Sequence, residues 1–229
     1  MVELRAVTID LDDTLFPQST WLAGAWAAVA AVAEAFGFDR VSFADSLVSF
    51  AAEGSDKGGI IDRALLAAGV DDPAPLLPAL VTAFTCWAPS ALPLYPSASD
   101  ALVRLRSAGL LIAIITDGNP QIQRSKVAAL GLDALVDHLV ISDEIGGRAT
   151  RKPSPAPFLR ALELCGASAE ETVHIGDRPA KDVAGAAAAG MRCIRVRTGE
   201  YAETLDGTGA CAPWATAATF AEAVDLLLP

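Results

Sequence analysis

Apolar segments that alternate with helical patterns are the feature that most limits the folds open to this chain. The strand candidates are Leu4–Ile9, Leu110–Thr116, Leu135–Ser142, Thr172–Gly176 and Cys193–Thr198. A helical pattern precedes each of the last four, over Ala98–Ser107, Pro120–Leu130, Ala156–Cys165 and Pro179–Ala189. Strands and helices that alternate in this way predict an α/β fold, with a parallel sheet and helices on both of its faces.

Residue types at the predicted helix ends support this division. Ser97 is expected to cap the helix that begins at Ala98, and Asn119 followed by Pro120 is typical of a helix start. Glycines follow the four helices, where they permit a left-handed ending, at Gly109, Gly131, Gly166 and Gly190.

Residues 16–96 depart from the alternation. They contain helical patterns and no strand pattern, and the helices are expected at Trp21–Phe36, Phe43–Ala52, Gly59–Ala68 and Pro75–Trp87. Three prolines, Pro89, Pro93 and Pro96, then predict a return linker. We therefore expect an all-helical insert over 16–96 in a core formed by residues 1–15 and 97–229. A terminal helix is expected at Ala217–Leu228, after a loop over Gly199–Pro213.

Charge and cysteine content narrow the classes of function. The chain has 28 acidic and 17 basic residues, a net charge of −11, and lacks the basic stripe typical of nucleic-acid-binding proteins. The cysteines, Cys86, Cys165, Cys193 and Cys211, have no C-x-x-C spacing, which favours free thiols in a reducing compartment. The longest uncharged apolar run, Trp21–Ala33, is too short to span a bilayer, and the charged N-terminus does not resemble a signal peptide. We expect a cytoplasmic protein.

Two carboxylates follow the first predicted strand. Asp10 and Asp12 lie two residues apart on an extended segment, so their side chains are expected to project to the same side. One carboxylate can act as a nucleophile while its neighbour holds or takes a proton. A solvated acidic turn or a helix cap is the alternative for any Asp-x-Asp sequence after a strand, but the longer string TIDLDDTLF is more specific.

Polar residues at other strand ends are expected beside this pair, because the carboxyl ends of parallel strands lie at one edge of a sheet. Thr116 ends the run LLIAIIT, and its hydroxyl and the amides of Asp117 and Gly118 are suited to bind phosphate oxygens. Lys152 lies in a proline-rich loop and is suited to place a positive charge beside a phosphoryl group. The alternative for Thr116 and Asp117 is that they only cap the end of the strand and the start of the next helix. The alternative for Lys152 is an ordinary surface lysine.

A second pair of carboxylates follows the strand Thr172–Gly176. Asp177 and Asp182, in the string GDRPAKD, are close enough to share a hard cation and its waters. The alternative is that Asp177 caps a helix while Asp182 is exposed. His138 and His174 fall within strand patterns and are expected to be structural.

Together these strings resemble the signature motifs of the haloacid dehalogenase-like (HAD) superfamily. The matching residues are Asp10, Asp12 and Thr14 in DLDDTL, Thr116 in IITDGN, Lys152 in RKPSP, and Asp177 with Asp182 in GDRPAKD. The motifs occur in the family's order, and the resemblance covers residues 1–15 and about 97–198.

The resemblance implies a Rossmann-like core, a helical cap inserted after the first motif, and a Mg²⁺-dependent phosphatase that acts on a small phosphorylated metabolite. In such enzymes the residue matching Asp10 forms an aspartyl phosphate, and the residue matching Asp12 protonates the leaving oxygen and then activates water. The resemblance implies that the carboxylates of Asp10 and Asp177 and the backbone carbonyl of Asp12 bind Mg²⁺, with Asp182 beside the ion. It also implies that Thr116 and Lys152 contact the phosphoryl group.

Two rival functions are open. A halidohydrolase is disfavoured by Asp12 and Thr14, because a halide leaving group needs no proton. A non-catalytic HAD-like binding or regulatory protein is disfavoured because all the candidate catalytic residues are present. Among phosphatase substrates, nucleoside monophosphates, sugar phosphates and triose phosphates all fit the motifs.

Several residues outside the motifs have open roles. Arg178 departs from the small or neutral residue frequent in the family, and it is expected to meet Asp182, reach the substrate or face solvent. Five residues of the insert are candidates for the substrate pocket, with core aromatics and solvated charges as the alternative: Trp21, Trp26, Arg40, Lys57 and Arg63.

Overall fold

The structure, a computed structural model, describes residues 3–54, 57–209 and 212–228. It divides into two compact units. One unit contains the segment up to Gln18 together with the chain from Ala91 onward, and the other contains Ser19–Ser90. Cys86, Cys165 and Cys193 form no disulfide, and Cys211 lies outside the described residues.

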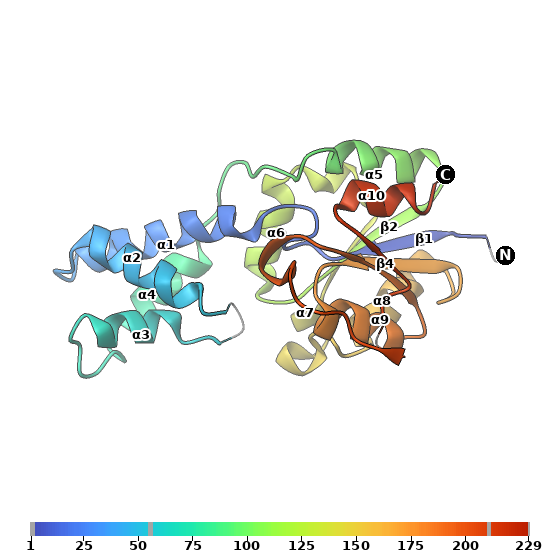
Figure 1. Cartoon of the computed structure of the whole chain (residues 1–229). Helices are drawn as coiled ribbons and strands as arrows, with labels where there is room; N and C mark the ends of the chain where they lie inside the picture. The colour runs from blue at the N-terminus through green and yellow to red at the C-terminus, as the bar shows by residue number, and fades with distance from the viewer. Residues whose placement is uncertain (1–2, 55–56, 210–211, 229) are drawn as a thin grey trace. The chain divides into compact units, whose positions relative to one another are not determined.

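The first unit is built on a six-stranded sheet in the order β3-β2-β1-β4-β5-β6 (Figure 1). The strands are β1 (Ala6–Ile9), β2 (Leu111–Thr116), β3 (His138–Ile141), β4 (Thr172–Gly176), β5 (Arg192–Val196) and β6 (Ala215–Ala217). Every neighbouring pair is parallel. The central strands β1 and β4 are buried along their whole length, as a parallel sheet covered on both faces requires. The predicted α/β, Rossmann-like fold is confirmed.

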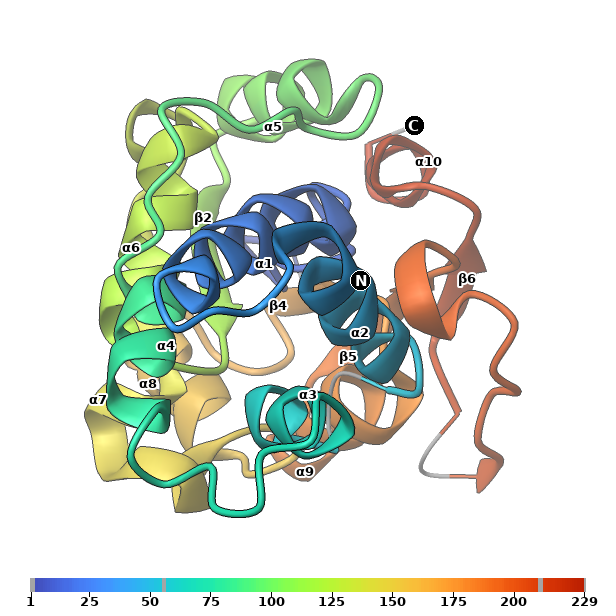
Figure 2. The same ribbon diagram turned by 90° about the vertical axis from the view of Figure 1, so that its left-hand side faces the viewer.

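Helices cover both faces of this sheet. Helices α5 (Ala98–Ser107) and α10 (Phe220–Asp225) pack together on one face, and α8 (Ala156–Cys165) and α9 (Ala184–Ala188) lie on the other (Figures 1 and 2). Helix α6 (Pro120–Ala129) follows β2, whereas the short α7 (Ser142–Gly146) follows β3. Because each crossover returns to the start of a parallel strand, the carboxyl ends of the strands share one edge.

The predicted helix ends are confirmed with one exception. The Asn119 side chain accepts hydrogen bonds from the backbone amides of Gln121 and Ile122, and the four predicted helix-ending glycines have positive φ. The expected Ser97 cap is wrong, because the Ser97 side chain makes no capping hydrogen bond. Its φ of 62° is left-handed, whereas a capping side chain needs an extended backbone to reach the first turn.

Two elements differ from the predicted pattern. Strand β6 was not predicted, because its three residues are too few to show an alternation, and the final helix consequently begins only at Phe220. The helix predicted over Pro179–Ala189 begins with a π-helical turn, Pro179–Val183, before α9. This wider turn carries Asp182.

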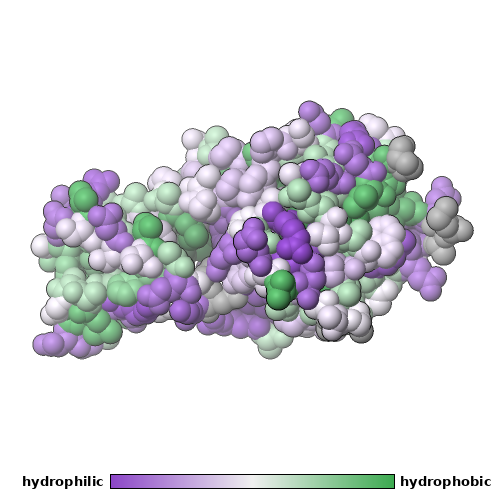
Figure 3. All heavy atoms as spheres, viewed as in Figure 1, coloured by the Kyte–Doolittle hydropathy of each residue, from purple (hydrophilic) through white to green (hydrophobic). Residues whose placement is uncertain are grey.

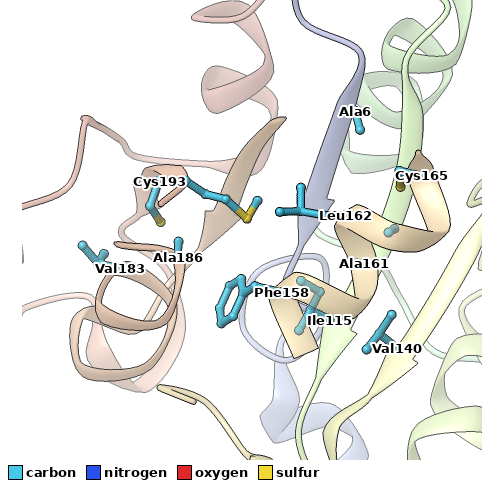
Figure 4. Packing of buried hydrophobic residues seen from close by; sticks show 12 residues of the cluster. Ala6, Ile115, Val140, Phe158, Ala161, Leu162, Cys165, Val183, Ala186 and Cys193 are labelled. Carbon is cyan, nitrogen blue, oxygen red and sulfur yellow. The ribbon is translucent and has the colours of Figure 1, made fainter. Parts of the chain in front are cut away.

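A hydrophobic cluster between the sheet and helices α8 and α9 includes Val183 of that turn. Phe158 on α8 packs with Ile115 on β2 and Ala186 on α9 (Figure 4). A Cβ atom on Gly185 would come within 2.4 Å of the Phe158 ring. The glycine therefore allows α9 to approach α8 closely.

The second unit consists of helices in its described part: α1 (Gln18–Glu34, whose first residue belongs to the first unit), α2 (Arg40–Ala51), α3 (Ile60–Ala67) and α4 (Leu77–Thr85). It has its own buried core, which includes Trp26, Phe43, Leu47 and Leu80. The Trp26 ring stacks on Phe84 with a centroid separation of 4.6 Å. The helices predicted in this stretch are present.

None of the helices in the described ranges is both long and apolar enough to cross a membrane. On the face shown in Figure 3, hydrophilic and hydrophobic side chains are interspersed on the surface.

Candidate active site

Three sequence-predicted residues lie at the carboxyl edge of the three central strands. Asp10 directly follows β1, Thr116 ends β2, and Asp177 directly follows β4. Strand β1 pairs with both neighbours, and its Ile9 is level with Ile114 and Ile175. The predicted convergence of these strand ends is therefore present in the fold.

Lys152 joins two of the carboxylates. Its Nζ atom donates to Oδ1 of Asp10, to Oδ1 of Asp182 at 2.6 Å and to the Ile115 carbonyl at 3.3 Å. Lys152 is 5% exposed and Asp182 is fully buried. The alternatives of a surface lysine and an exposed aspartate are therefore wrong. Burial alone would lower the pKa of Lys152, but Asp10 and Asp182 outweigh it and hold that pKa above its usual range. Burial likewise opposes the ionised form of Asp182, yet the charge of Lys152 keeps its pKa below the usual range.

Asp10 is buried beside this lysine, and its second oxygen faces Thr14. The Thr14 hydroxyl donates to Oδ2 of Asp10 at 3.4 Å. Burial raises the pKa of Asp10 to about 7 despite the opposing charge of Lys152. A carboxylate fixed through both oxygens is well oriented to react with a bound electrophile.

In the part of the chain that the structure describes, the carboxylate of Asp177 lacks the compensating contacts that Asp10 and Asp182 have. Both of its carboxylate oxygens are buried and have no hydrogen-bond partner in the described structure. Burial, with the nearby carboxylates of Asp182 and Asp10, raises its pKa to about 10. One ligand atom from each of the three aspartates lies within 4.8 Å of the other two. Buried, unpaired carboxylate oxygens are the ligands that hard divalent cations prefer, so these residues fit a metal ion of that class.

The carboxylate of Asp12 is paired with Lys126, a residue that the sequence analysis missed. Lys126 Nζ lies 2.6 Å from Oδ1 of Asp12, and the lysine side chain is 2% exposed. Lys126 lies on the same side of α6 as the buried Ile122, four residues earlier. A charged residue at an apolar position of a helical pattern is the signal that could have identified it.

The loop after β2 is braced from two directions. The Lys152 amide donates to Oδ1 of Asp117, and Nε2 of Gln123 donates to the Asp117 carbonyl at 2.8 Å. Gly118 has a φ of 122°, and its backbone hydrogen-bonds the Asp143 carboxylate. Thr116, at 1% exposed, is fixed at the start of this loop.

His174 lies within β4, as expected, but its ring contacts the site. Nδ1 lies 2.9 Å from the Thr8 hydroxyl and Nε2 lies 3.3 Å from Oδ1 of Asp182. Burial lowers the pKa of His174, which favours the neutral ring. A carboxylate can only accept, so the proton is on Nε2 and the Thr8 hydroxyl donates to Nδ1. His174 occupies an ordinary position within the strand, and we find no sequence signal that predicts its contact with Asp182.

Arg178 contacts both Asp182 and the loop that follows β5. Its backbone amide donates to Oδ2 of Asp182 at 2.9 Å, whereas its guanidinium stacks on Tyr201 and donates to the Tyr201 hydroxyl at 2.7 Å. The buried Arg195, also missed by the sequence analysis, donates to the Tyr201 and Asp177 carbonyls. Arg195 thus ties this loop to the residue that precedes Arg178.

Candidate pocket residues of the helical unit have other contacts within that unit. Trp21 and Trp26 are buried, at 2% and 5% exposed. Arg63 and Lys57 both pair with Glu53, whereas Arg40 is exposed.

Comparisons with known proteins identify relatives of this chain. The sequence model of the haloacid dehalogenase-like hydrolase family matches residues 4–190. A glyceraldehyde 3-phosphate phosphatase of Methanopyrus kandleri is 34% identical over 204 residues, which are 86% of each chain. A ribulose-1,5-bisphosphate 5-phosphatase of Halopiger xanaduensis is 32% identical over 214 residues, 88% of each chain.

Other curated phosphatase relatives match over less than half of their own length. Among solved structures, a 2-haloacid dehalogenase of Pseudomonas syringae superposes with a TM-score of 0.65, at 25% identity, over 98% of both chains.

Proposed function

The chain belongs to the haloacid dehalogenase-like hydrolase family, and from this membership we propose that it is a Mg²⁺-dependent phosphatase. Its substrate in this proposal is the monoester of a small phosphorylated metabolite, and Asp10 forms an aspartyl phosphate. The relatives matched over most of the chain are named phosphatases of a triose phosphate and a pentose bisphosphate, which supports this substrate class. We also propose a cytoplasmic location, as expected from the cysteine spacing in the sequence.

The observation that supports the proposal most strongly is the buried contact between Lys152 and Asp10, beside the unpaired carboxylate of Asp177. A phosphate entering this site would meet one cation from the protein and several anions. A Mg²⁺ ion bound by Asp10, Asp177 and the Asp12 carbonyl would neutralise phosphate charge when present. Asp182 then orients Lys152.

The protein's residues have distinct roles in the proposed reaction. A carboxylate oxygen of Asp10 attacks phosphorus, and the electron pair of the ester P–O bond goes to the leaving oxygen, which takes a proton from Asp12. Water then attacks phosphorus, gives its proton to Asp12, and the bond between phosphorus and Asp10 breaks. Both chemical steps use the same acid–base carboxylate in opposite directions.

The phosphoryl oxygens would be bound from the loop after β2. We assign this role to the Thr116 hydroxyl, the Asp117 amide and Lys152, with Gly118 providing the left-handed turn. Donors fixed before the substrate arrives stabilise transition-state charge without reorganisation. Lys152 can serve here because its Nζ atom already lies at the nucleophile.

We further propose that the helical unit, Ser19–Ser90, acts as a cap over the site. The chain enters and leaves this unit near Gln18 and Ala91, so two short segments can serve as hinges. Small-angle scattering with and without Mg²⁺ and BeF₃⁻ tests the cap. The radius of gyration is expected to fall on ligand binding, and an unchanged radius at saturation would mean a rigid unit.

The rival halidohydrolase is the second candidate, since a dehalogenase shares the fold at a TM-score of 0.65. Purified protein should be assayed for phosphate release from p-nitrophenyl phosphate and a phosphometabolite panel, and for halide release from 2-haloacids. The proposal expects Mg²⁺-dependent phosphate release and no halide release. Halide release without phosphate release would support the dehalogenase, and neither activity would favour the non-catalytic reading.

A further inference from the structure

We propose that Lys126 is the positioning residue of Asp12, so that helix α6 orients the acid–base carboxylate of the reaction. This inference rests on the proposed phosphatase function and extends it to a residue outside the four motifs. The carrying observation is the ion pair between the two side chains, which joins residues 114 positions apart.

The position of Lys126 on its helix requires an explanation. The buried side of α6 consists of Ile122, Gln123, Lys126 and Val127. An ammonium group removed from water is strongly unfavourable unless a partner compensates it. Asp12 is that partner, at 2.6 Å, and it belongs to the loop that also carries Asp10.

The same side of α6 makes a second contact with a motif loop. Gln123, three residues before Lys126, donates to the Asp117 carbonyl. The two polar side chains of the buried face therefore reach two different loops, one after β2 and one after β1. Helix α6 thereby ties the predicted phosphate-binding loop to the loop of the acid–base residue.

Contacts around Asp12 restrict its carboxylate further. Its backbone forms a bridge with Phe16, and Lys126 Nζ lies 5.9 Å from the centre of the Phe16 ring. The Asp12 side chain is 18% exposed, against 7% for Asp10, so it is the more accessible of the two to a leaving group or water. Lys126 engages Oδ1, which assigns proton transfer to the other oxygen, Oδ2. The proton moves from Oδ2 to the ester oxygen as the P–O bond breaks, and returns to Oδ2 from the attacking water.

If Lys126 positions Asp12, the effect of replacing Lys126 should depend on the leaving group of the ester. Lys126→Met should lower kcat/KM for an alkyl phosphate by about 10²-fold, the effect expected when a reacting group is misplaced by about 1 Å. The loss with p-nitrophenyl phosphate should be at least about tenfold smaller, because nitrophenolate leaves with little need of a proton. Arg124→Gln, on the exposed face of the same helix, breaks a surface pair with Glu144 and is the matched control. The control should leave the ratio of the two esters unchanged.

The double variant Asp12→Ala/Lys126→Met separates orientation from a general effect on the fold. If Lys126 acts through Asp12, the double variant should retain the kcat/KM of Asp12→Ala for the alkyl ester. Equal losses with both esters, or losses that multiply in the double variant, would overturn the inference. If Lys126→Met does not fold, Lys126→Gln replaces it under the same criteria, because the amide removes the charge but keeps a donor.

The outcomes also distinguish this inference from the proposed function. Wild-type phosphate release that depends on Asp10, combined with equal ester losses in Lys126→Met, would reject only the role of Lys126. A wild-type protein without phosphate release on any ester would reject the phosphatase itself.

Discussion

The ammonium nitrogen of Lys152 lies 2.6 Å from Oδ1 of Asp182, and the two side chains are 3% and 0% exposed. The same nitrogen contacts Asp10, so one cation links two buried carboxylates, one after β1 and one in the π-helical turn. A third carboxylate, Asp177, lies beside them with no hydrogen-bond partner of its own among the described residues. Charge compensation is therefore incomplete in the protein alone, and this incompleteness is the basis of the predictions below.

Removing the ammonium group of Lys152 should lower both the activity and the stability of the protein. Lys152→Met is expected to lower kcat/KM for p-nitrophenyl phosphate by about 10²–10³-fold, as for other lost transition-state donors. Because it leaves buried carboxylates uncompensated, it should also lower the free energy of unfolding by about 3–5 kcal/mol in metal-free buffer. Denaturant titration and steady-state kinetics measure the two effects. Arg160→Met, which removes an exposed pair with Glu163, is the control and should match wild type.

Metal binding should be measurable without turnover. Titration calorimetry is expected to detect Mg²⁺ binding to the wild-type protein, and Mg²⁺ should raise the melting temperature because it binds only the folded state. Asp177→Asn should weaken binding, since it replaces a charged ligand by a neutral one. If Asp177→Asn bound Mg²⁺ with unchanged affinity, Asp177 would not be a metal ligand. If the protein remained active after EDTA treatment in buffer without any divalent ion, the proposed metal dependence would be wrong.

Gly176 should tolerate no side chain. A Cβ atom there would lie 2.4 Å from the Asp182 carboxyl carbon, and Asp182 is fixed by Lys152, His174 and the Arg178 amide. Gly176→Ala is expected to cost about 1–3 kcal/mol of stability through overpacking and to reduce activity by about 10²-fold through displacement of the site.

Gly24→Ala is a matched control for that experiment. Its Cβ would meet the Trp87 ring at the same 2.4 Å, but within the helical unit. We expect a similar loss of stability with activity close to wild type below the melting temperature. Equal activity losses in the two variants would show that Gly176 acts only through general packing.

The proton on His174 should be observable directly. The chain has two histidines, so ¹⁵N spectra of histidine-labelled protein contain two ring systems. His174 is expected as the neutral tautomer with hydrogen on Nε2, because that atom faces Asp182 while Thr8 faces Nδ1. Thr8→Val should shift the Nδ1 resonance, which then lacks a donor. A proton on Nδ1 in the wild-type protein would contradict the proposed direction of both hydrogen bonds.

Residues at strand ends could be predicted from the sequence, because a parallel sheet places all such ends together. Asp10, Thr116 and Asp177 follow this rule, and each ends or follows an apolar run that identifies its strand. Lys152 could be added only through its motif. The π-helical turn that buries Asp182 could not be predicted, since the string PAKDV is equally compatible with an α-helix.

The site contacts of residues within helices and strands were not predicted, for a different reason. Lys126, His174 and Arg195 occupy positions where the local pattern expects an apolar side chain, and their partners are distant in sequence. Only tertiary structure brings Lys126 to Asp12 or Arg195 to the Asp177 carbonyl. The loop after β5 is likewise positioned by Arg195, which no local property of the loop reveals.

The most direct test of the central claim is a search for the aspartyl phosphate itself. Protein with Mg²⁺ is mixed with a ³²P-labelled phosphate ester, quenched in acid within the first turnover, digested, and mapped by mass spectrometry. We predict label on Asp10, released by hydroxylamine as an acyl phosphate requires, and no label in Asp10→Asn. Phosphate release with no protein-bound label at any time in the first turnover, or label on another residue, would contradict the account.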